Sequence, residues 1–239
     1  LVNVLLDVRG VIKRSGSRSI AFWDESFTCD RAYLRDLMKA LRTIDGLSFS
    51  CITRLDLVDK EILSLLKEAG CHQILFGIES GSEQILKRMQ KGMHKDFIRK
   101  KVGEVHSFGI PWLGFFMMGY PGERKEDILE TLDFLKELDP SAAEINLFNP
   151  LPGTPIWNEL EAKGLVHEDM DFSQYSQSSL KNCFVSDLRP EEFKELALQM
   201  ARAFDEHNQK KSGGKSIPVR KKSESVYGRT HQAPNPPCS

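Results

Sequence analysis

Apolar residues along the chain alternate between short continuous runs and stripes with helical spacing. The runs are Ser19–Trp23, Leu47–Thr53, Gln73–Ile78, Trp112–Met118 and Ala143–Phe148. Strands that are covered on both faces of a parallel sheet read as continuous apolar runs, so these segments predict such strands. Between them, apolar residues recur every three or four positions, which predicts helices. This alternation is typical of βαβ units and a parallel sheet.

The predicted helices follow the strands in a regular order, around Leu34–Leu41, Ile62–Ala69, Ser82–Gln90, Lys95–Ser107, Ile128–Leu138 and Pro155–Lys163. A further helix already runs at Leu1, because Val4, Val8 and Val11 follow helical spacing and no capping residue precedes them. We therefore expect the chain to be truncated, with one strand upstream. Counting that strand, six βα units make an open barrel. The expected fold is α/β, a partial (βα)6 TIM-like barrel with its first strand missing.

The pattern weakens after Lys163. Pro190–Asn208 reads as one more helix, and the low-complexity tail from Gln209 holds seven Lys/Arg and one Glu. This composition predicts disorder, and a solvated tail is a more usual role for a charge run than binding an anionic partner. We expect a barrel over residues 1–165, a C-terminal helical extension over 166–208 and a disordered basic tail over 209–239.

Composition narrows the class of protein without indicating a function. The 239 residues suffice for one domain with a large core. The formal net charge of −1 gives no bias toward nucleic acid or membrane, and no apolar run reaches the roughly 18 residues of a membrane helix. The five cysteines are odd in number and dispersed, which favours a reducing cytoplasm over a disulfide framework.

Polar, glycine-rich or proline-rich residues follow every predicted strand. Ligands of parallel βα folds bind beyond the carboxyl ends of the strands, where the βα loops meet. Carboxylates suit ammonium and ribose hydroxyl groups, a guanidinium suits a carboxylate, and glycines let the backbone approach a flat ring. The strand ends together therefore suit a zwitterionic, hydroxyl-bearing ligand. The candidate binding residues are Asp24, Glu25, Arg54, Glu79, Ser80, Gly119, Tyr120, Pro121, Gly122, Asn149 and Pro150.

Each of these groups also has an ordinary structural explanation. Asp24 and Glu25 suit a capped or solvated loop, and Arg54 suits a surface ion pair with Asp56. The proline- and glycine-containing segments suit turns. What favours a site is that such a group recurs at every strand end. We expect His72, His94 and His106 to be structural or exposed rather than ligands, and Cys51 and Cys71 to pack as small apolar side chains.

Five motifs occur in a fixed order along these strand ends. They are FWDESFT (Phe22–Thr28), RLDLVDKEILSLLKEAGC (Arg54–Cys71), FGIESGSEQILKRMQKG (Phe76–Gly92), MGYPGE (Met118–Glu123) and NPLPGTPIW (Asn149–Trp157). Together they resemble the radical S-adenosylmethionine (SAM) superfamily, over roughly residues 1–163. The branch that they resemble most often carries an N-terminal cobalamin-binding domain and includes methyltransferases and ring-forming enzymes.

The resemblance implies a partial (βα)6 barrel in which a [4Fe-4S] cluster binds SAM and donates one electron, so that SAM is cleaved to a 5′-deoxyadenosyl radical. It places Asp24 and Glu25 near the SAM amino group and Arg54 near the SAM carboxylate. Glu79 and Ser80 match the position that contacts the ribose. The residues that would flank the adenine are Gly119–Gly122, Asn149 and Pro150. The resemblance also implies an electron donor such as flavodoxin or ferredoxin, and cobalamin on a domain upstream.

One family feature is absent from this sequence. The superfamily holds its cluster on a CxxxCxxC loop between the first strand and the first helix. The cysteines present here are spaced too widely to replace that loop, so we expect no metal ligands in this chain and no activity from it alone. The tail also lacks the compact basic domain that tRNA methylthiotransferases add, so nucleic acid is not an expected partner.

Three hypotheses follow. The first is a cytoplasmic radical SAM enzyme with an unknown substrate, of which this chain is a fragment. Its intact form would carry out methyl transfer, cyclisation or similar radical chemistry. The second is a degenerate, non-catalytic barrel that binds no cluster, which the missing cysteines favour. The third is a barrel enzyme that uses no cluster. It requires a catalytic base, and no predicted strand end offers His or Lys.

Overall fold

A curled, five-stranded parallel sheet forms the centre of the molecule. The computed structural model describes residues 1–170, 172, 183–185 and 187–213. The strands lie side by side in chain order, and each is parallel to its neighbours. They are β1 (Ser19–Phe22), β2 (Ser48–Thr53), β3 (Cys71–Glu79), β4 (Trp112–Met118) and β5 (Ala142–Leu147). Every strand expected from the sequence is present, with ends that shift by at most two residues.

The helices follow the apolar stripes of the sequence. Their bounds are α1 (Val2–Ser15), α2 (Arg31–Leu41), the short 3₁₀ helix η1 (Leu55–Leu57), α3 (Lys60–Glu68), α4 (Glu83–Arg88), α5 (Lys95–Phe108), α6 (Lys125–Leu138), α7 (Pro155–Ala162) and α8 (Pro190–Lys211). Helix α8 continues to Lys211, so the expected boundary at Asn208 falls inside the helix. Residues 214–239 of the expected tail lie outside the described residues.

Side-chain caps explain where several helices begin. The Asp30 carboxylate accepts a hydrogen bond from the backbone N–H of Tyr33 at 2.9 Å, which starts α2. The Thr154 hydroxyl caps α7, and Pro155 follows at a position where its missing N–H has no helical partner to lose. Each cap satisfies a backbone donor that the first turn leaves unpaired. The capping residues thus fix the positions at which the loops after the strands end and the helices begin.

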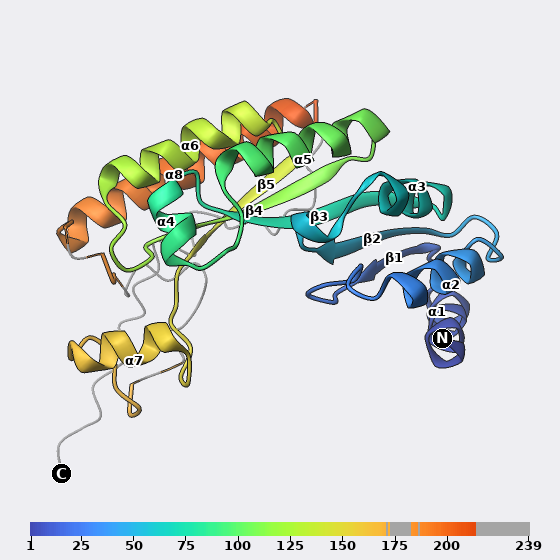
Figure 1. The fold of residues 1–239 in the computed structure, drawn as a ribbon, viewed down its shortest axis with the longest axis horizontal. Helices are drawn as coiled ribbons and strands as arrows, with labels where there is room; N and C mark the ends of the chain where they lie inside the picture. The colour runs from blue at the N-terminus through green and yellow to red at the C-terminus, as the bar shows by residue number, and fades with distance from the viewer. Residues whose placement is uncertain (171, 173–182, 186, 214–239) are drawn as a thin grey trace, which may run out of the picture.

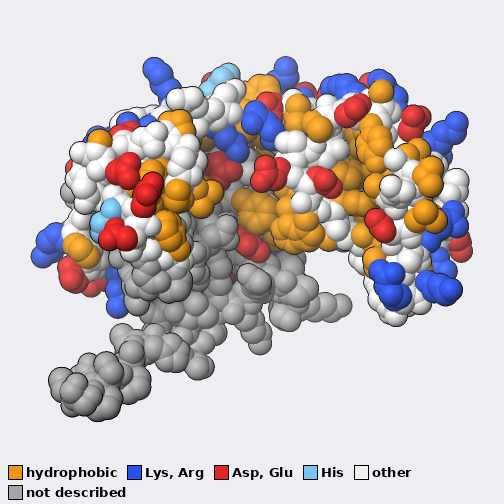
Figure 2. Space-filling model, turned by 90° about the horizontal axis from the view of Figure 1, so that it is seen from below, with side chains coloured by type: hydrophobic (Ala, Val, Ile, Leu, Met, Phe, Trp, Pro, Cys, Tyr) orange, Lys and Arg blue, Asp and Glu red, His pale blue; other side chains and the backbone are white. Residues whose placement is uncertain are grey.

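Four of the helices cover the convex side of the curled sheet, and α7 lies on the concave side, below the end of β5 (Figure 1). Helices α3, α5, α6 and α8 lie above the strands in this view, and α1 and α2 lie beside β1. The main core fills the space between sheet and helices, and its large side chains include Phe49, Phe76, Phe116 and Phe193. Figure 2 shows the opposite side as a hollow with hydrophobic side chains inside it and acidic side chains beside them.

Helix α8 covers the free edge of β5. The Asn208 side-chain amide bonds twice to the backbone of Ala143, accepting from its N–H at 2.8 Å and donating to its C=O at 2.8 Å. The side chain therefore acts as one residue of a neighbouring strand. At the other edge, β2 is the only strand among the described residues that pairs with β1. This arrangement confirms the α/β class and the partial TIM-like barrel.

Two of the three histidines named in the sequence analysis have structural roles, the third, His72, is exposed, and the two cysteines are buried. His94 accepts a hydrogen bond from the Phe97 backbone at 3.2 Å and caps α5. His106 accepts one from the indole N–H of Trp112 at 2.9 Å. Cys51 is fully buried in the core. Within the described part of the chain, no helix has the length and apolar character needed to cross a membrane.

Candidate functional site

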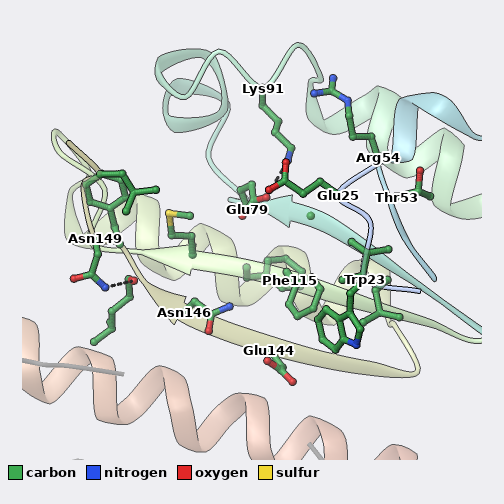
Figure 3. Close-up of a pocket in the computed structure, with 18 residues that line it drawn as sticks. Trp23, Glu25, Thr53, Arg54, Glu79, Lys91, Phe115, Glu144, Asn146 and Asn149 are labelled. Atoms are coloured by element: carbon green, nitrogen blue, oxygen red, sulfur yellow. Dashed lines mark hydrogen bonds and ion pairs between the residues drawn. The ribbon is translucent and has the colours of Figure 1, made fainter. Parts of the chain in front are cut away.

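A cavity of about 1030 Å³ opens on the concave face at the carboxyl ends of the strands (Figure 3). Every strand, or the loop directly after it, contributes to its wall. Four of the candidate binding residues line it: Glu25, Arg54, Glu79 and Asn149. Residues that are far apart in the sequence therefore converge on one space, as the parallel topology requires.

Glu79 enters the cavity from an irregular end of β3. The register of β3 against β4 shifts between Gly77 and Glu79, and Glu79 has a φ of 70°, a conformation that residues other than glycine rarely adopt. Its carboxylate pairs with Nζ of Lys91 at 2.9 Å, and the two side chains are only 21% and 18% exposed. A Cβ on Gly77 would collide with the Glu79 carboxylate, so this glycine makes room for the ion pair above the sheet.

Lys91 is a site residue that the sequence did not reveal. It lies between α4 and α5 rather than at a strand end, and its backbone N–H is anchored to the C=O of Leu86 at 3.1 Å. This loop carries the ammonium group over the end of β3 (Figure 3). The sequence analysis considered only strand ends, none of which carries His or Lys. Lys91 instead reaches the site from a later loop that folds back over β3.

Arg54 is held in position by a neighbour in sequence. Its Nε and NH2 groups donate to the two carboxylate oxygens of Asp56 at 3.0 and 2.8 Å. The guanidinium holds the pKa of Asp56 below its ordinary value. Arg54 was expected either to form a surface ion pair with Asp56 or to line a binding site. The structure shows both, since it forms an exposed ion pair and also lines the cavity. Glu25, in the loop after β1, is exposed and faces the same space.

The wall formed by β5 carries a second group of polar side chains, from Glu144 and Asn146 on the strand and Asn149 after it. The Asn149 amide donates to the C=O of Leu147 at 3.4 Å. Below these residues the floor of the cavity is apolar. Ile52, Leu75 and Phe115 line it, and they pack with the buried side chains of Leu113 and Ala142 in one small cluster. The cavity thus has a charged end at β1–β3, an apolar floor and a polar end at β5.

Ser80 does not reach the cavity, although it follows Glu79 directly. Its side chain is buried, lies 3.3 Å from the Thr131 hydroxyl and accepts a hydrogen bond from the backbone of Ser82 at 3.1 Å. The Ser82 hydroxyl caps α4 and donates to Asp127 at 2.6 Å. These bonds fasten the turn after β3 to α6. The hydroxyl of Ser80 is thus committed to the fold, and the expected contact with a ribose remains a prediction.

The motif after β4 also points away from the main cavity. A Cβ on Gly119 would lie 2.9 Å from the ring of Phe193, so this glycine allows α8 to pack closely against the end of β4. The ring of Tyr120 packs edge-on against Phe148, with centroids 4.8 Å apart. Four further candidates are likewise outside the cavity wall: Asp24, Pro121, Gly122 and Pro150.

Glu123 is a buried acid that holds this turn together. Its side chain is 1% exposed, and one carboxylate oxygen accepts from the backbone N–H of Gly119 at 2.5 Å. The other oxygen is buried with no hydrogen-bond partner among the described residues. Burial raises the pKa of Glu123 to about 8, and the backbone donors only partly oppose it. The sequence placed Glu123 in the motif without a role.

We expect Glu123 to make the protein less stable as the pH rises from about 5 to about 8. Its folded pKa of about 8 lies above the ordinary 4.5, so folding takes up a proton in this range. The free energy of unfolding then falls by up to about 1.4 kcal/mol per pH unit. Urea unfolding of the wild type and of Glu123→Gln measures the effect. The neutral variant should lose this slope, the exposed-site control Glu126→Gln should keep it, and equal slopes in all three proteins would contradict the assignment.

The described residues do not fit an iron–sulfur cluster. No three His, Cys, Asp or Glu side chains among them lie close enough together to hold a metal ion. The cavity residues fit the other cofactor that the motifs suggest, because two carboxylates, a guanidinium and an amide face one space. Those groups match the ammonium, carboxylate and hydroxyl groups of SAM.

Comparison with known families decides what kind of protein this is. The sequence model of the radical SAM superfamily matches residues 3–135, more than half of the chain. The chain belongs to the radical SAM superfamily. The match covers the segment from α1 through most of α6, which includes Glu25, Arg54, Glu79 and Lys91.

Relatives of this radical SAM chain include methyltransferases. An uncharacterized methyltransferase of Pyrococcus horikoshii is 32% identical over 153 residues, which cover 63% of this chain and 33% of the relative. Cytidylyl-2-hydroxyethylphosphonate methyltransferase of Streptomyces wedmorensis is 28% identical over 193 residues, 76% of this chain and 36% of the relative. The chain therefore spans about a third of the length of these relatives.

Solved structures show the same fold. TsrM, a radical SAM methyltransferase from Kitasatospora setae solved with cobalamin and a [4Fe-4S] cluster bound, matches with a TM-score of 0.58 and 19% identity. The match covers 66% of this chain and 31% of that one. At this identity the likeness supports the partial barrel and nothing finer.

Proposed function

We propose that this chain is the SAM-binding barrel of a longer radical SAM enzyme. The complete enzyme would cleave SAM reductively and use the resulting radical for methyl transfer, cyclisation or related chemistry on an unknown substrate. The observation that carries the proposal is the convergence of Glu25, Arg54 and Glu79 on one cavity at the strand ends. Family membership supports the reaction class. The coverage of about a third of the relatives supports the existence of further parts.

The cavity residues would hold SAM by its polar groups. Glu25 and Glu79 suit its ammonium and ribose hydroxyl groups, and the N–H groups of Arg54 not bonded to Asp56 suit its carboxylate. The ion pair with Lys91 orients the Glu79 carboxylate, so that it is pre-positioned rather than free to rotate. Asn149 lies at the other end of the cavity, where we expect the adenine.

The cluster and its reductant belong to the complete enzyme in this proposal. When bound, SAM and a [4Fe-4S] cluster supply reductive cleavage, with the electron drawn from a donor such as flavodoxin or ferredoxin. The cysteine ligands would come from residues beyond these 239. Cobalamin is a further proposed cofactor, supported by the resemblance of the motifs to the cobalamin-carrying branch.

We expect Glu79→Gln to weaken binding of S-adenosylhomocysteine by about tenfold, because a neutral amide loses charge-assisted hydrogen bonds worth about 1.4 kcal/mol. The substitution keeps the side-chain size, and the new residue also has a Cβ, so the unusual φ of 70° at position 79 affects both proteins alike. Isothermal titration calorimetry on the chain measures the affinity, and Glu161→Gln, at an exposed site on α7, is the matched control. Equal affinities for the three proteins, or no binding to the wild type, would refute a SAM site at Glu79.

The second candidate is a non-catalytic barrel that binds no cluster. The absence of a ligand set among the described residues favours it. Anaerobic reconstitution of the complete gene product with iron and sulfide separates the two proposals. The enzyme proposal expects the absorption and electron paramagnetic resonance signals of a [4Fe-4S] cluster, and SAM cleavage that Glu79→Gln reduces. A complete product with no cluster signal would favour the non-catalytic barrel.

A further inference from the structure

Glu144 differs from the other carboxylates of the cavity. It lies on the inner face of β5 and lines the cavity wall at the end opposite Glu25 and Glu79 (Figure 3). In the register of the sheet it is the direct neighbour of Phe115 on β4. Asn146, two residues further along the strand, lies on the same wall and closer to the strand end. Glu144 therefore lies further from the carboxyl end of β5, and deeper in the cavity, than Asn146 and Asn149.

This carboxylate has no partner within the described part of the chain. Glu79 pairs with Lys91 at 2.9 Å, whereas no hydrogen bond or ion pair joins Glu144 to another described residue. The side chain is partly buried beside apolar neighbours. A carboxylate that loses water without gaining a partner is unfavourable, and an incoming cation would relieve that cost.

The surroundings of Glu144 are aromatic and apolar. Phe115 lies beside it, and the apolar floor of the cavity includes Ile52 and Leu75. Trp23 contributes a large ring to the same cavity and is 73% exposed. Aromatic faces attract both flat apolar groups and cations. The chemistry around Glu144 therefore suits a cation attached to a flat apolar body.

We propose that the deeper part of the β5 wall, beneath Asn146 and Asn149, is a substrate subsite for an amine carried on an aromatic body, with Glu144 binding the ammonium group and Phe115 contacting the ring. The proposal deepens the proposed function and rests on it, because it assigns the rim of the same cavity, from Glu25 to Asn149, to SAM. The space is sufficient. A cavity of about 1030 Å³ lies at the top of the range of about 300–1,000 Å³ that single-ligand sites occupy.

Three probes of similar size test the charge preference of this subsite. They are 2-phenylethylamine (cationic), 2-phenylethanol (neutral) and 3-phenylpropionate (anionic). Titration calorimetry of the chain saturated with S-adenosylhomocysteine should show the amine binding about tenfold more tightly than the alcohol, with the anion weakest. Glu144→Gln is close to isosteric. In this variant the amine and the alcohol should bind with about equal affinity, while S-adenosylhomocysteine binds as before. Glu161→Gln should retain the preference.

The outcomes separate this proposal from the proposed function. Equal binding of the three probes, binding of none of them, or an unchanged amine preference in Glu144→Gln overturns the amine subsite. Loss of S-adenosylhomocysteine binding in Glu144→Gln would place Glu144 in the SAM site instead, which overturns this inference and leaves the proposed function intact. If wild-type chain binds the amine but no S-adenosylhomocysteine, the proposed function fails. Thermal unfolding of each variant confirms that the folded protein is compared.

Discussion

Gly81→Ala is expected to lower the free energy of unfolding by about 3 kcal/mol. A Cβ at this position would lie 2.5 Å from the carbonyl oxygen of Glu130 and 2.7 Å from Thr131 Cα in helix α6. The clash cannot relax easily, because the Gly81 N–H is bonded to the Thr131 hydroxyl at 2.9 Å and both groups are buried. Inserting a methyl group therefore forces apart the turn after β3 and the helix that supports it.

A glycine in a helix supplies the matched control for Gly81→Ala. Gly103 lies in α5, and a Cβ added to it would meet no atom within 4 Å, so Gly103→Ala should raise stability by about 1 kcal/mol through helix propensity. Urea unfolding of the two variants measures changes of opposite sign. Because Glu79 lies two residues before Gly81, Gly81→Ala should also weaken S-adenosylhomocysteine binding. A Gly81→Ala protein as stable as the wild type would show that this turn does not pack as described.

Asn208→Ala is expected to lower the free energy of unfolding by about 3 kcal/mol. The substitution removes both hydrogen bonds of 2.8 Å between α8 and Ala143 and leaves a backbone N–H and a C=O of β5 without partners. Buried backbone groups that lose their partners retain the cost of desolvation. Residue Glu144 follows Ala143 directly, so the same change should loosen the proposed amine subsite.

The effect of Asn208→Ala is measured by urea unfolding beside Gln209→Ala. Gln209 is the next residue of α8 and is exposed, so its replacement should change stability by less than about 0.5 kcal/mol. Hydrogen exchange at the Ala143 amide gives an independent reading, because the bond to Asn208 protects it. If the Ala143 amide exchanges equally slowly in Asn208→Ala, the edge of β5 is protected by something other than this side chain.

The strands and helices were largely predictable because their signals are local. Apolar runs such as Trp112–Met118 became strands with unchanged bounds, and Asp30 caps a helix where its sequence position predicts. The exceptions lie at the ends of elements. Helix α8 runs past Asn208 to Lys211, since the polar residues there still face solvent or bond to the edge of β5.

The site residues were predictable only as far as chain direction determines position. Glu25, Arg54, Glu79 and Asn149 share one cavity because parallel strands bring their carboxyl ends to the same rim. Ser80 and Gly119 lie at the same rim but turn toward α6 and α8, respectively. A motif locates a residue at a strand end, but the backbone of the turn decides which face its side chain takes.

By itself, the sequence determined the order of strands and helices, the rim at which the candidate binding residues lie and the family, because these depend on local periodicity and on motif order. The tertiary structure alone decided that Lys91 folds back onto Glu79, that Glu123 is buried beneath Gly119 and that Glu144 faces an apolar hollow without a partner among the described residues. These facts depend on which distant segments pack together, and neither spacing nor composition records that.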